Sequence, residues 1–162
     1  MKIVGIDPGL SGAIAILEDK KVLSIFDMPV MAEGKKNKRQ LNSAQLVNII
    51  KENTFKNEDI VVVVEQVNAM PGQGVTSMFN FGQTFGAIKG VCAALNLPIF
   101  FVRPSKWKKH FELINSSKDA SRTKVIEMYP SLSNQLSKKK DVNKSDAILI
   151  ARYFDDTRLK EK

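Results

Sequence analysis

Three acidic side chains stand where apolar segments begin or end, and they are the residues of this sequence best suited to chemistry. Asp7 ends the stretch "KIVGID", Glu65 ends "IVVVVE", and Asp146 opens "DAILIARYF". A carboxylate at the end of a buried strand is costly unless it is paired or bound to a cation. If the two strands are adjacent and parallel, Asp7 and Glu65 lie at one edge of the sheet. Three carboxylates that converge there form an oxygen-rich site suited to Mg²⁺ or Mn²⁺.

Each acidic residue also has a simpler interpretation. Asp7 could be a turn residue before "PGLSG", Glu65 could be an ordinary strand-end charge, and Asp146 with Asn143 fits a helix capping box. Their combination in a basic protein, after two apolar strands, favours the metal interpretation. The glycines of "DPGLSG" do not have the spacing of a P-loop. We expect this small turn instead to let a phosphate and a metal approach Asp7.

The elements that would position these residues follow from the apolar pattern. The expected strands are Lys2–Asp7, Ala13–Leu17, Val22–Phe26, the stretch "DIVVVVE" ending at Glu65, and Pro98–Val102. The expected helices are Ser43–Glu52, Val75–Leu95, Pro104–Phe111, Lys118–Tyr129 and Ser145–Asp155, with loops at 28–42 and 136–144. This order predicts a single α/β domain over residues 1–162, with an antiparallel meander at its start and helices covering both faces of a mixed sheet.

The composition excludes several classes of protein. No apolar run reaches the roughly 18 residues that a membrane span needs, so we expect no membrane partner. The only cysteine, Cys92, excludes an internal disulfide, and one histidine, His110, leaves no Cys/His zinc site. We expect a reducing location, cytoplasmic or nucleoid-associated, which includes a phage-infected cell or an organelle matrix.

A net charge of +8 favours a polyanionic partner such as DNA or RNA. The basic residues form groups in the first loop, around Trp107, before Asp146 and along one helix. These groups are Lys35, Lys36, Lys38 and Arg39; Arg103, Lys106, Lys108 and Lys109; Lys138, Lys139, Lys140 and Lys144; and Lys118, Arg122 and Lys124. The first group could equally be a solvated face, whereas the groups near the acidic residues favour nucleic-acid binding.

Five stretches in this order resemble the motifs of RuvC-type Holliday junction resolvases, and they span nearly the whole chain. They are "GIDPGLSGAIAIL", "VVVVEQV", "FGQTFGAIKGV", "LPIFFV" and "SDAILIARY". The resemblance implies an RNase H-like fold, a homodimer, and nicking of four-way DNA junctions that depends on Mg²⁺, with Mn²⁺ as a substitute. It also implies two ions in each active site and a product with a 5′-phosphate.

Carried over by motif, Asp7, Glu65 and Asp146 match the metal-binding carboxylates of that family. The fourth ligand is usually Asp or His, but here the matching position is Asn143, whose amide oxygen brings no charge; Asp141 is the alternative. Lys108 and Arg122 stand where the family has basic residues near the scissile phosphate.

The family also tends to place an aromatic residue near the junction centre, three positions after the glutamate. In this sequence that position is Asn68. Met70 could serve instead, as could Phe79 or Phe81, although we expect both phenylalanines in the core. We expect Trp107 to anchor its helix in the core rather than to stack on a base.

Other functions remain compatible with the sequence. One is an RNase H-type or YqgF-type nuclease that acts on RNA or on RNA–DNA hybrids. Another, motivated by Asn143, is a junction-binding protein without catalytic activity. A sugar-kinase or actin-like ATPase also begins with a D-x-G turn, but that fold needs two such domains, for which this chain is too short.

Overall fold

A computed structural model describes residues 1–34, 37–54 and 59–158 of the chain. Its main feature is a five-stranded sheet with the order β3-β2-β1-β6-β7. The strands are β1 (Lys2–Asp7), β2 (Ala13–Glu18), β3 (Lys21–Asp27), β6 (Ile60–Glu65) and β7 (Ile99–Val102). The first three form an antiparallel meander, whereas β6 runs parallel to both β1 and β7. The sheet is therefore mixed, as expected.

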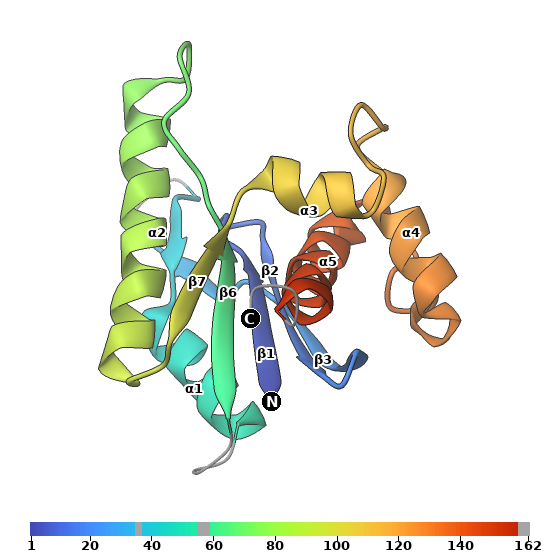
Figure 1. The fold of residues 1–162 in the computed structure, drawn as a ribbon. Coiled ribbons are helices and arrows are strands. Elements are labelled where there is room, and N and C mark those ends of the chain that lie inside the picture. The colour runs from blue at the N-terminus through green and yellow to red at the C-terminus, as the bar shows by residue number, and fades with distance from the viewer. Residues whose placement is uncertain (35–36, 55–58, 159–162) are drawn as a thin grey trace.

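Helices cover both faces of this sheet (Figure 1). They are α1 (Ser43–Asn53), α2 (Val75–Ala94), α3 (Pro104–His110), α4 (Ala120–Met128) and α5 (Val142–Thr157), and two short 3₁₀ turns, η1 (Pro130–Leu132) and η2 (Lys139–Asp141), lie between α4 and α5. In Figure 1, α1 and α2 lie on one side of the sheet and α3, α4 and α5 on the other. No helix of the described residues is long and apolar enough to cross a membrane.

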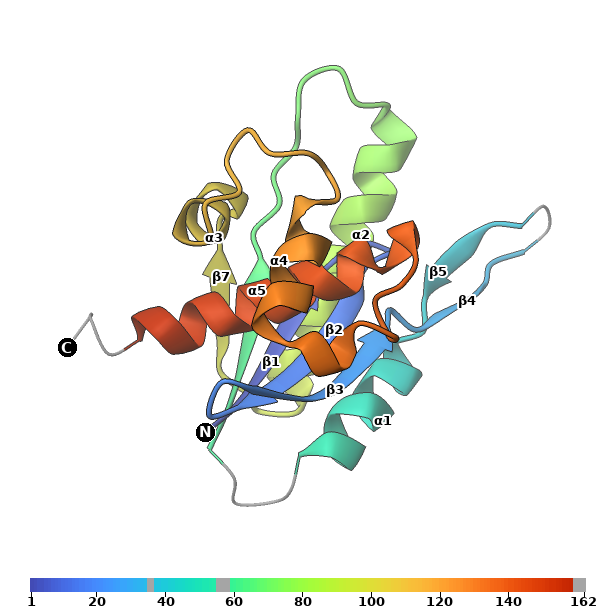
Figure 2. The same ribbon diagram turned by 90° about the vertical axis from the view of Figure 1, so that its right-hand side faces the viewer.

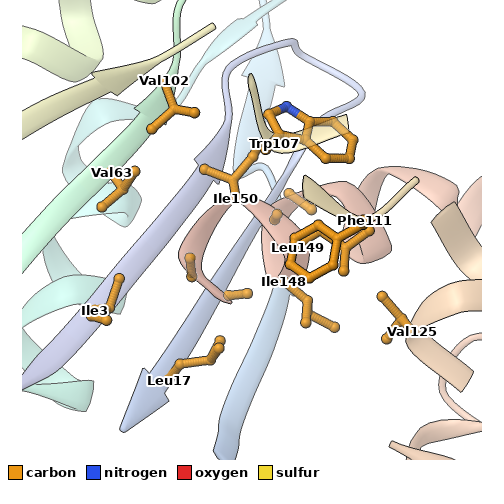
Figure 3. Close-up of a cluster of buried hydrophobic side chains, with 14 of the residues drawn as sticks. Ile3, Leu17, Val63, Val102, Trp107, Phe111, Val125, Ile148, Leu149 and Ile150 are labelled. Carbon is orange, nitrogen blue, oxygen red and sulfur yellow. The ribbon is translucent and has the colours of Figure 1, made fainter. Parts of the chain in front are cut away.

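The two faces of the central strands build two separate cores. Because side chains alternate along a strand, Ile3 and Val63 face α3 and α5, whereas Val4 and Val62 face α1 and α2. Figure 3 shows the first of these cores, in which Trp107 packs with side chains of the sheet and α5. Burial on both faces explains why β1 and β6 are nearly continuous apolar runs.

Three sequence predictions about the elements need correction. The segment expected as a loop at 28–42 contains a hairpin of β4 (Val30–Ala32) and β5 (Arg39–Leu41), which projects from the domain (Figure 2). Within this segment Lys35 and Lys36 lie outside the described residues. The cap of α1 is Asn42 rather than Ser43, since the Asn42 side chain accepts a hydrogen bond from the Gln45 backbone N–H at 3.0 Å.

The third correction concerns the last helix, which begins at Val142 rather than at Ser145. Residues 136–144 are therefore not a plain loop, because η2 leads directly into α5. Asn143 and Asp146 both lie inside the helix, one turn apart, so the capping-box interpretation of this pair is wrong.

Candidate active site

Asp7 and Glu65 come together because β1 and β6 are parallel neighbours. Ile6 pairs with Val64 in the register of the two strands, so the next residue of each strand is the carboxylate. The chain then turns away at both ends, into the "PGLSG" turn after β1 and a loop after β6. Parallel strands thus place two carboxylates side by side at one edge of the sheet, as the sequence predicted.

A close helix–strand contact brings Asp146 to the same place. A Cβ at Gly5 of β1 would lie 2.4 Å from the Ala147 backbone oxygen and 2.7 Å from the Ala151 Cβ. Only glycine therefore allows α5 to cross β1 at this distance. Ala147 and Ala151 have small side chains, so they also allow this close approach. Asp146 precedes Ala147 in the helix, and the contact therefore brings it near the carboxyl end of β1.

The electrostatics of the site reflect both the burial of the three carboxylates and their charges on one another. Burial, followed by the charges of Glu65 and Asp146, raises the pKa of Asp7 to about 7. Burial also raises the pKa of Glu65, and burial together with the Glu65 charge raises that of Asp146 to about 6. Buried like charges disfavour ionisation, so the cluster takes up protons near neutral pH when no cation neutralises it.

Trp107 and Lys108 of α3 hold the acidic cluster from one side. The Trp107 Nε1–H donates a hydrogen bond to Glu65 Oε2 at 2.7 Å, which lowers the pKa that burial has raised. Trp107 is 1% exposed, so it is a core residue, as expected, and not a surface for stacking a base. The charge of Lys108 lowers the pKa of all three carboxylates, and its Nζ lies 5.4 Å from the centre of the Trp107 ring.

The donor set is suited to a hard divalent cation, since carboxylate oxygens are the ligands that Mg²⁺ and Mn²⁺ prefer. Burial and the neighbouring acidic charges raise the pKa of Asp7 and Asp146, and a bound cation would offset both effects. Within the described ranges, however, no three acidic, histidine or cysteine side chains lie close enough together to enclose an ion as they stand. An ion held here would therefore be bound by one or two of these carboxylates with water completing its shell, or by all three once they draw closer together.

Both residues considered as a fourth ligand make other contacts. The Asn143 Nδ2 donates to the Ser11 backbone oxygen at 2.7 Å and so ties α5 to the turn that follows Asp7. Asp141 is 4% exposed; its Oδ2 accepts from the Lys138 backbone N–H at 2.9 Å, and its Oδ1 lies 3.1 Å from Lys144 Nζ. The amide oxygen of Asn143 is not used in that hydrogen bond, whereas both oxygens of Asp141 are occupied.

One glycine of the turn "DPGLSG", Gly12, is required by close contact within the turn itself. A Cβ at Gly12 would lie 2.0 Å from the Asp7 backbone oxygen, so this glycine is required by the chain itself. At Gly9 an added Cβ would meet its nearest atom at 3.7 Å, an ordinary contact. The expectation that the turn is small in order to admit a phosphate therefore stays a prediction.

The basic residues expected to contact DNA divide into those that face the site and those that do not. Lys108 and Lys118 line a cavity of about 190 Å³ together with Asp146. Arg122 instead makes two hydrogen bonds of 2.8 Å to Asp119 and a third, of 2.9 Å, to the Leu136 backbone oxygen. Arg122 thus fastens the segment after α4, and Lys118 is the second cation close to the acidic cluster.

The remaining predicted contacts have varied positions. Lys144 Nζ is paired with Asp141 at 3.1 Å and lies 3.7 Å from Asp27. Lys140 lines a second cavity, of about 550 Å³, beside Lys118 and Asn143. Lys109 is exposed on α3 and Lys124 is half-buried on α4. Lys106 lies on the far side of α3 in a separate groove.

The loop between β6 and α2 presents the residues considered for the junction centre. Asn68 is exposed, and Met70 is 61% exposed. Phe79, at the start of α2, is 70% exposed, so its expected place in the core is wrong, whereas Phe81 is half-buried. Asn68 is not aromatic, so the exposed Phe79 and Met70 are the candidates for the apolar residue near the junction centre.

Two side chains of the site were missed by sequence reasoning. The first is Trp107 as the hydrogen-bond donor to Glu65. The second is Ser121, whose buried hydroxyl has no hydrogen-bond partner within 3.5 Å in the described chain, yet lies close enough to lower the pKa of Asp146. A signal for Trp107 existed, because α3 directly follows β7, the neighbour of the strand that ends at Glu65. No sequence signal distinguishes Ser121 from the other serines.

Two solved structures are similar to this fold over nearly the whole chain. A structure of RuvC from Thermus thermophilus matches with a TM-score of 0.57 and 16% identity, over 99% of this chain and 97% of that chain. The structure of T. thermophilus RuvC in complex with a Holliday junction substrate matches with a TM-score of 0.61 and 16% identity, over 99% and 96% of the two chains. The chain has the RuvC fold.

The RuvC fold is an RNase H-like α/β fold, so the fold expected from the motifs is confirmed. No protein-family model matches the sequence, and the search of curated proteins finds no match. At this level of identity the RuvC likeness establishes the architecture, and what the chain does must be argued from its own site.

Proposed function

We propose that this protein is a structure-selective endonuclease that resolves four-way DNA junctions by hydrolysing a phosphodiester bond. The observation that carries the proposal is that Asp7, Glu65 and Asp146 lie near enough for their charges to act on one another, while Lys108 and Lys118 line a cavity with Asp146. A hydrolytic site for nucleic acid needs this combination of negative charge for cations and positive charge for phosphate. The RuvC structure with a Holliday junction substrate supports a junction as the DNA form.

Asp7, Glu65 and Asp146 would hold the divalent cations, with the amide oxygen of Asn143 as a further ligand. When bound, Mg²⁺ or Mn²⁺ ions supply Lewis acidity for the attacking water and for the leaving 3′-oxygen, so that the product carries a 5′-phosphate. Trp107 orients the Glu65 carboxylate through its N–H. Lys108 and Lys118 attract the phosphate and offset the negative charge of the pocket. The lone histidine is not needed, since His110 pairs with Asp156 instead.

We further propose that the protein acts as a homodimer that uses the outer face of α2. Gly82, Gly86 and Gly90 lie on this face, and nothing within 4 Å would meet a Cβ at any of them. Packing inside one subunit therefore does not explain these glycines. The same face carries Val75 and Phe79, which are 87% and 70% exposed. A helix that is thin along one stripe and apolar at one end suits contact with a second copy.

A nicking assay tests the proposed activity. A labelled four-way junction, a linear duplex and an RNA–DNA hybrid are incubated with Mg²⁺, with Mn²⁺ or with a chelator. We expect symmetric nicks in the junction alone, lost with the chelator and with the Asp7→Asn or Asp146→Asn variants, while junction binding by the variants persists. Cleavage of the hybrid in preference to the junction would favour the RNase H-type alternative. Unchanged cleavage by Asp7→Asn would contradict the site assignment.

The inactive junction-binding alternative retains two supporting observations. The carboxylates do not enclose an ion as they stand in the described chain, and Asn143 brings no charge. Tight junction binding without nicking at any Mg²⁺ or Mn²⁺ concentration would establish this alternative. An Asn143→Asp variant sharpens the test, because an added carboxylate should lower the cation concentration that a weakly loaded nuclease needs.

The dimer is tested by mass. We expect light scattering to give twice the chain mass for the unmodified protein and the monomer mass for Gly86→Arg, because an arginine fills the thin stripe of α2. A matched change on another exposed helix surface, Lys51→Arg on α1, should leave the mass unchanged. A monomer for the unmodified protein at micromolar concentration would contradict the proposal.

A further inference from the structure

A groove with aromatic and basic walls lies at the β7 edge of the sheet, on the side of α3 and α5. Its volume is about 340 Å³, which is within the range of specific ligand sites. The walls come from β7, the start of α3 and the C-terminal half of α5. We call it the aromatic groove, and it is defined by Phe100, Arg103, Lys106, Tyr153, Phe154 and Arg158.

The apolar part of the aromatic groove is exposed in an unusual place. β7 is the last strand of the sheet, so no described strand covers its outer edge. Phe100 on this strand is 48% exposed, and its ring lies 5.0 Å from that of Phe154 at an angle of 49°. Edge strands usually carry charged residues or proline that discourage further pairing, but the sequence of β7 is Ile-Phe-Phe-Val.

The charged part of the aromatic groove is positive and largely unpaired. Arg103 and Lys106 are exposed and make no side-chain hydrogen bond or ion pair with a described residue. Arg158 pairs with Asp155 at 3.0 Å, but its buried Nε has no hydrogen-bond partner in the described chain. Asp155 itself is 5% exposed and also accepts from the Lys20 backbone N–H. Within residues 1–34, 37–54 and 59–158, no free carboxylate therefore balances the cations of the groove.

The aromatic groove is separated from the acidic cluster by α3. Lys106 and Lys108 are two residues apart on this helix, and at about 100° per residue they point roughly 200° apart. Lys108 faces the carboxylates, whereas Lys106 faces the aromatic groove. The α2 face proposed for dimerisation lies on the other side of the sheet (Figure 1). The aromatic groove thus opens on a different side of α3 from the carboxylates and on a different side of the sheet from α2.

We propose that the aromatic groove is a docking site for an acidic segment of a partner protein, which carries several Asp or Glu residues and a bulky apolar side chain. The apolar side chain packs against the touching rings of Phe100 and Phe154, and the carboxylates meet Arg103, Lys106 and Arg158. The positive charge of the groove favours an acidic segment over a neutral or basic one. Residues 159–162 of the chain itself, Leu-Lys-Glu-Lys, carry a net charge of +1 and do not complement the groove.

Single-stranded DNA is the competing class, since aromatic rings and cations also bind unpaired bases. The position of the groove behind α3, away from the acidic cluster, favours a protein segment. The binding test therefore includes both classes of probe and needs no cleavage activity, so its outcome is independent of the proposed function.

The experiment uses a fluorescein-labelled peptide of four aspartates followed by Leu-Phe. Controls are a peptide in which the aspartates are lysines, a peptide in which Leu-Phe is Ala-Ala, and a labelled oligothymidine. We expect saturable binding of the first peptide alone, weakened roughly tenfold by Phe100→Ala and by Arg103→Glu. Matched control variants lie on the opposite edge strand: Leu23→Ala, at a residue 49% exposed, and Lys21→Glu at an exposed lysine. Neither should change the affinity.

Three results would overturn the proposal. The first is no saturable binding of the acidic peptide up to millimolar concentration. The second is equal weakening by Phe100→Ala and Leu23→Ala, or equal binding of the Ala-Ala peptide, either of which would indicate attraction by charge alone. The third is oligothymidine binding that Phe100→Ala weakens and the acidic peptide displaces, which would make the groove a site for single-stranded DNA. Circular dichroism of each variant confirms that the fold is intact.

Discussion

At the scale of single residues, the chemistry of the candidate active site depends on how burial sets the charge of each carboxylate. Asp7 is the most affected, because the apolar ends of two strands surround it and two other acidic residues face it. A carboxyl group with a raised pKa holds its proton in the folded protein at a pH where the unfolded chain has lost it. Folding stability must then fall as pH rises between those two pKa values.

This linkage predicts a measurable effect of Asp7→Asn. Without divalent ions, we expect the unmodified protein to lose stability from about pH 4 to pH 7, by up to about 1.4 kcal/mol per pH unit for each group still protonated. Asp7→Asn should be the more stable protein at pH 8 and nearly equal at pH 3. Urea unfolding in chelator at several pH values measures both curves. The exposed Asp59→Asn serves as the control, and parallel curves for Asp7→Asn and the unmodified protein would refute the linkage.

A second residue-scale prediction concerns the hydrogen bond from Trp107 to Glu65. Trp107→Phe keeps an aromatic ring in the core but removes the N–H donor. Because this hydrogen bond lowers the pKa of Glu65, its loss should let burial raise that pKa further. We expect the acidic limb of the cleavage profile to move to higher pH, with the folded spectrum retained. If the cleavage rate falls but the acidic limb of the pH profile stays in place, the indole of Trp107 matters only for packing.

At the scale of secondary-structure elements, the contact between β1 and α5 decides where Asp146 lies. Gly5→Ala would force its Cβ against the Ala147 backbone oxygen, and backbone cannot move aside as a flexible side chain can. We expect a loss of about 1–3 kcal/mol in the free energy of unfolding and a weaker response to Mn²⁺. Urea unfolding with and without Mn²⁺ tests this expectation.

Gly90→Ala on α2 is the matched substitution for Gly5→Ala, with the opposite expected sign. An added Cβ at Gly90 meets nothing within 4 Å in its own chain, and alanine is the better helix former by about 1 kcal/mol. Both substitutions are therefore compared in the Gly86→Arg background, in which the proposed dimer contact is absent. Stabilisation by Gly90→Ala together with destabilisation by Gly5→Ala would locate the requirement for glycine in the helix–strand contact. Equal effects of the two variants would argue against it.

At the scale of the whole molecule, the net charge of +8 is not uniformly available to DNA. Some basic residues are held by carboxylates of the protein itself, as Lys144 is by Asp141. Others, such as Lys140, line an open cavity next to the candidate active site. Only the second kind can release counterions from phosphate when DNA binds.

This division predicts different salt dependence for two neighbouring lysines. Lys140→Ala should reduce the slope of log K against log salt by about 0.9, the value for one phosphate contact. Lys144→Ala should change that slope by much less and should lower stability instead, because Asp141 loses its partner. Junction affinity measured at several salt concentrations decides the question, and a larger slope change for Lys144→Ala would contradict the assignment.

The sequence alone was sufficient for the order of the main elements and for the place of Asp7 and Glu65 at the ends of neighbouring parallel strands. The role of Asp7, Glu65 and Asp146 as metal ligands stays a prediction. Runs of buried β-branched residues, turn glycines and a charge at a strand end are local signals, and each depends on residues close together in the chain. The β4–β5 hairpin and the early start of α5 lack such local signals, and the sequence therefore did not predict them. Both lie in polar segments rich in lysine, which carry no apolar periodicity and are stabilised by contacts with distant residues.

Only the tertiary structure decided which charged side chains can act on a ligand and which are already engaged. Arg122 and Lys108 are both basic residues within helices, yet folding pairs the first with Asp119 and turns the second toward the carboxylates. The Trp107–Glu65 hydrogen bond likewise joins residues 42 positions apart. The residue types determine what chemistry is possible, whereas pairing and burial depend on distances through space, which the linear order of residues does not contain.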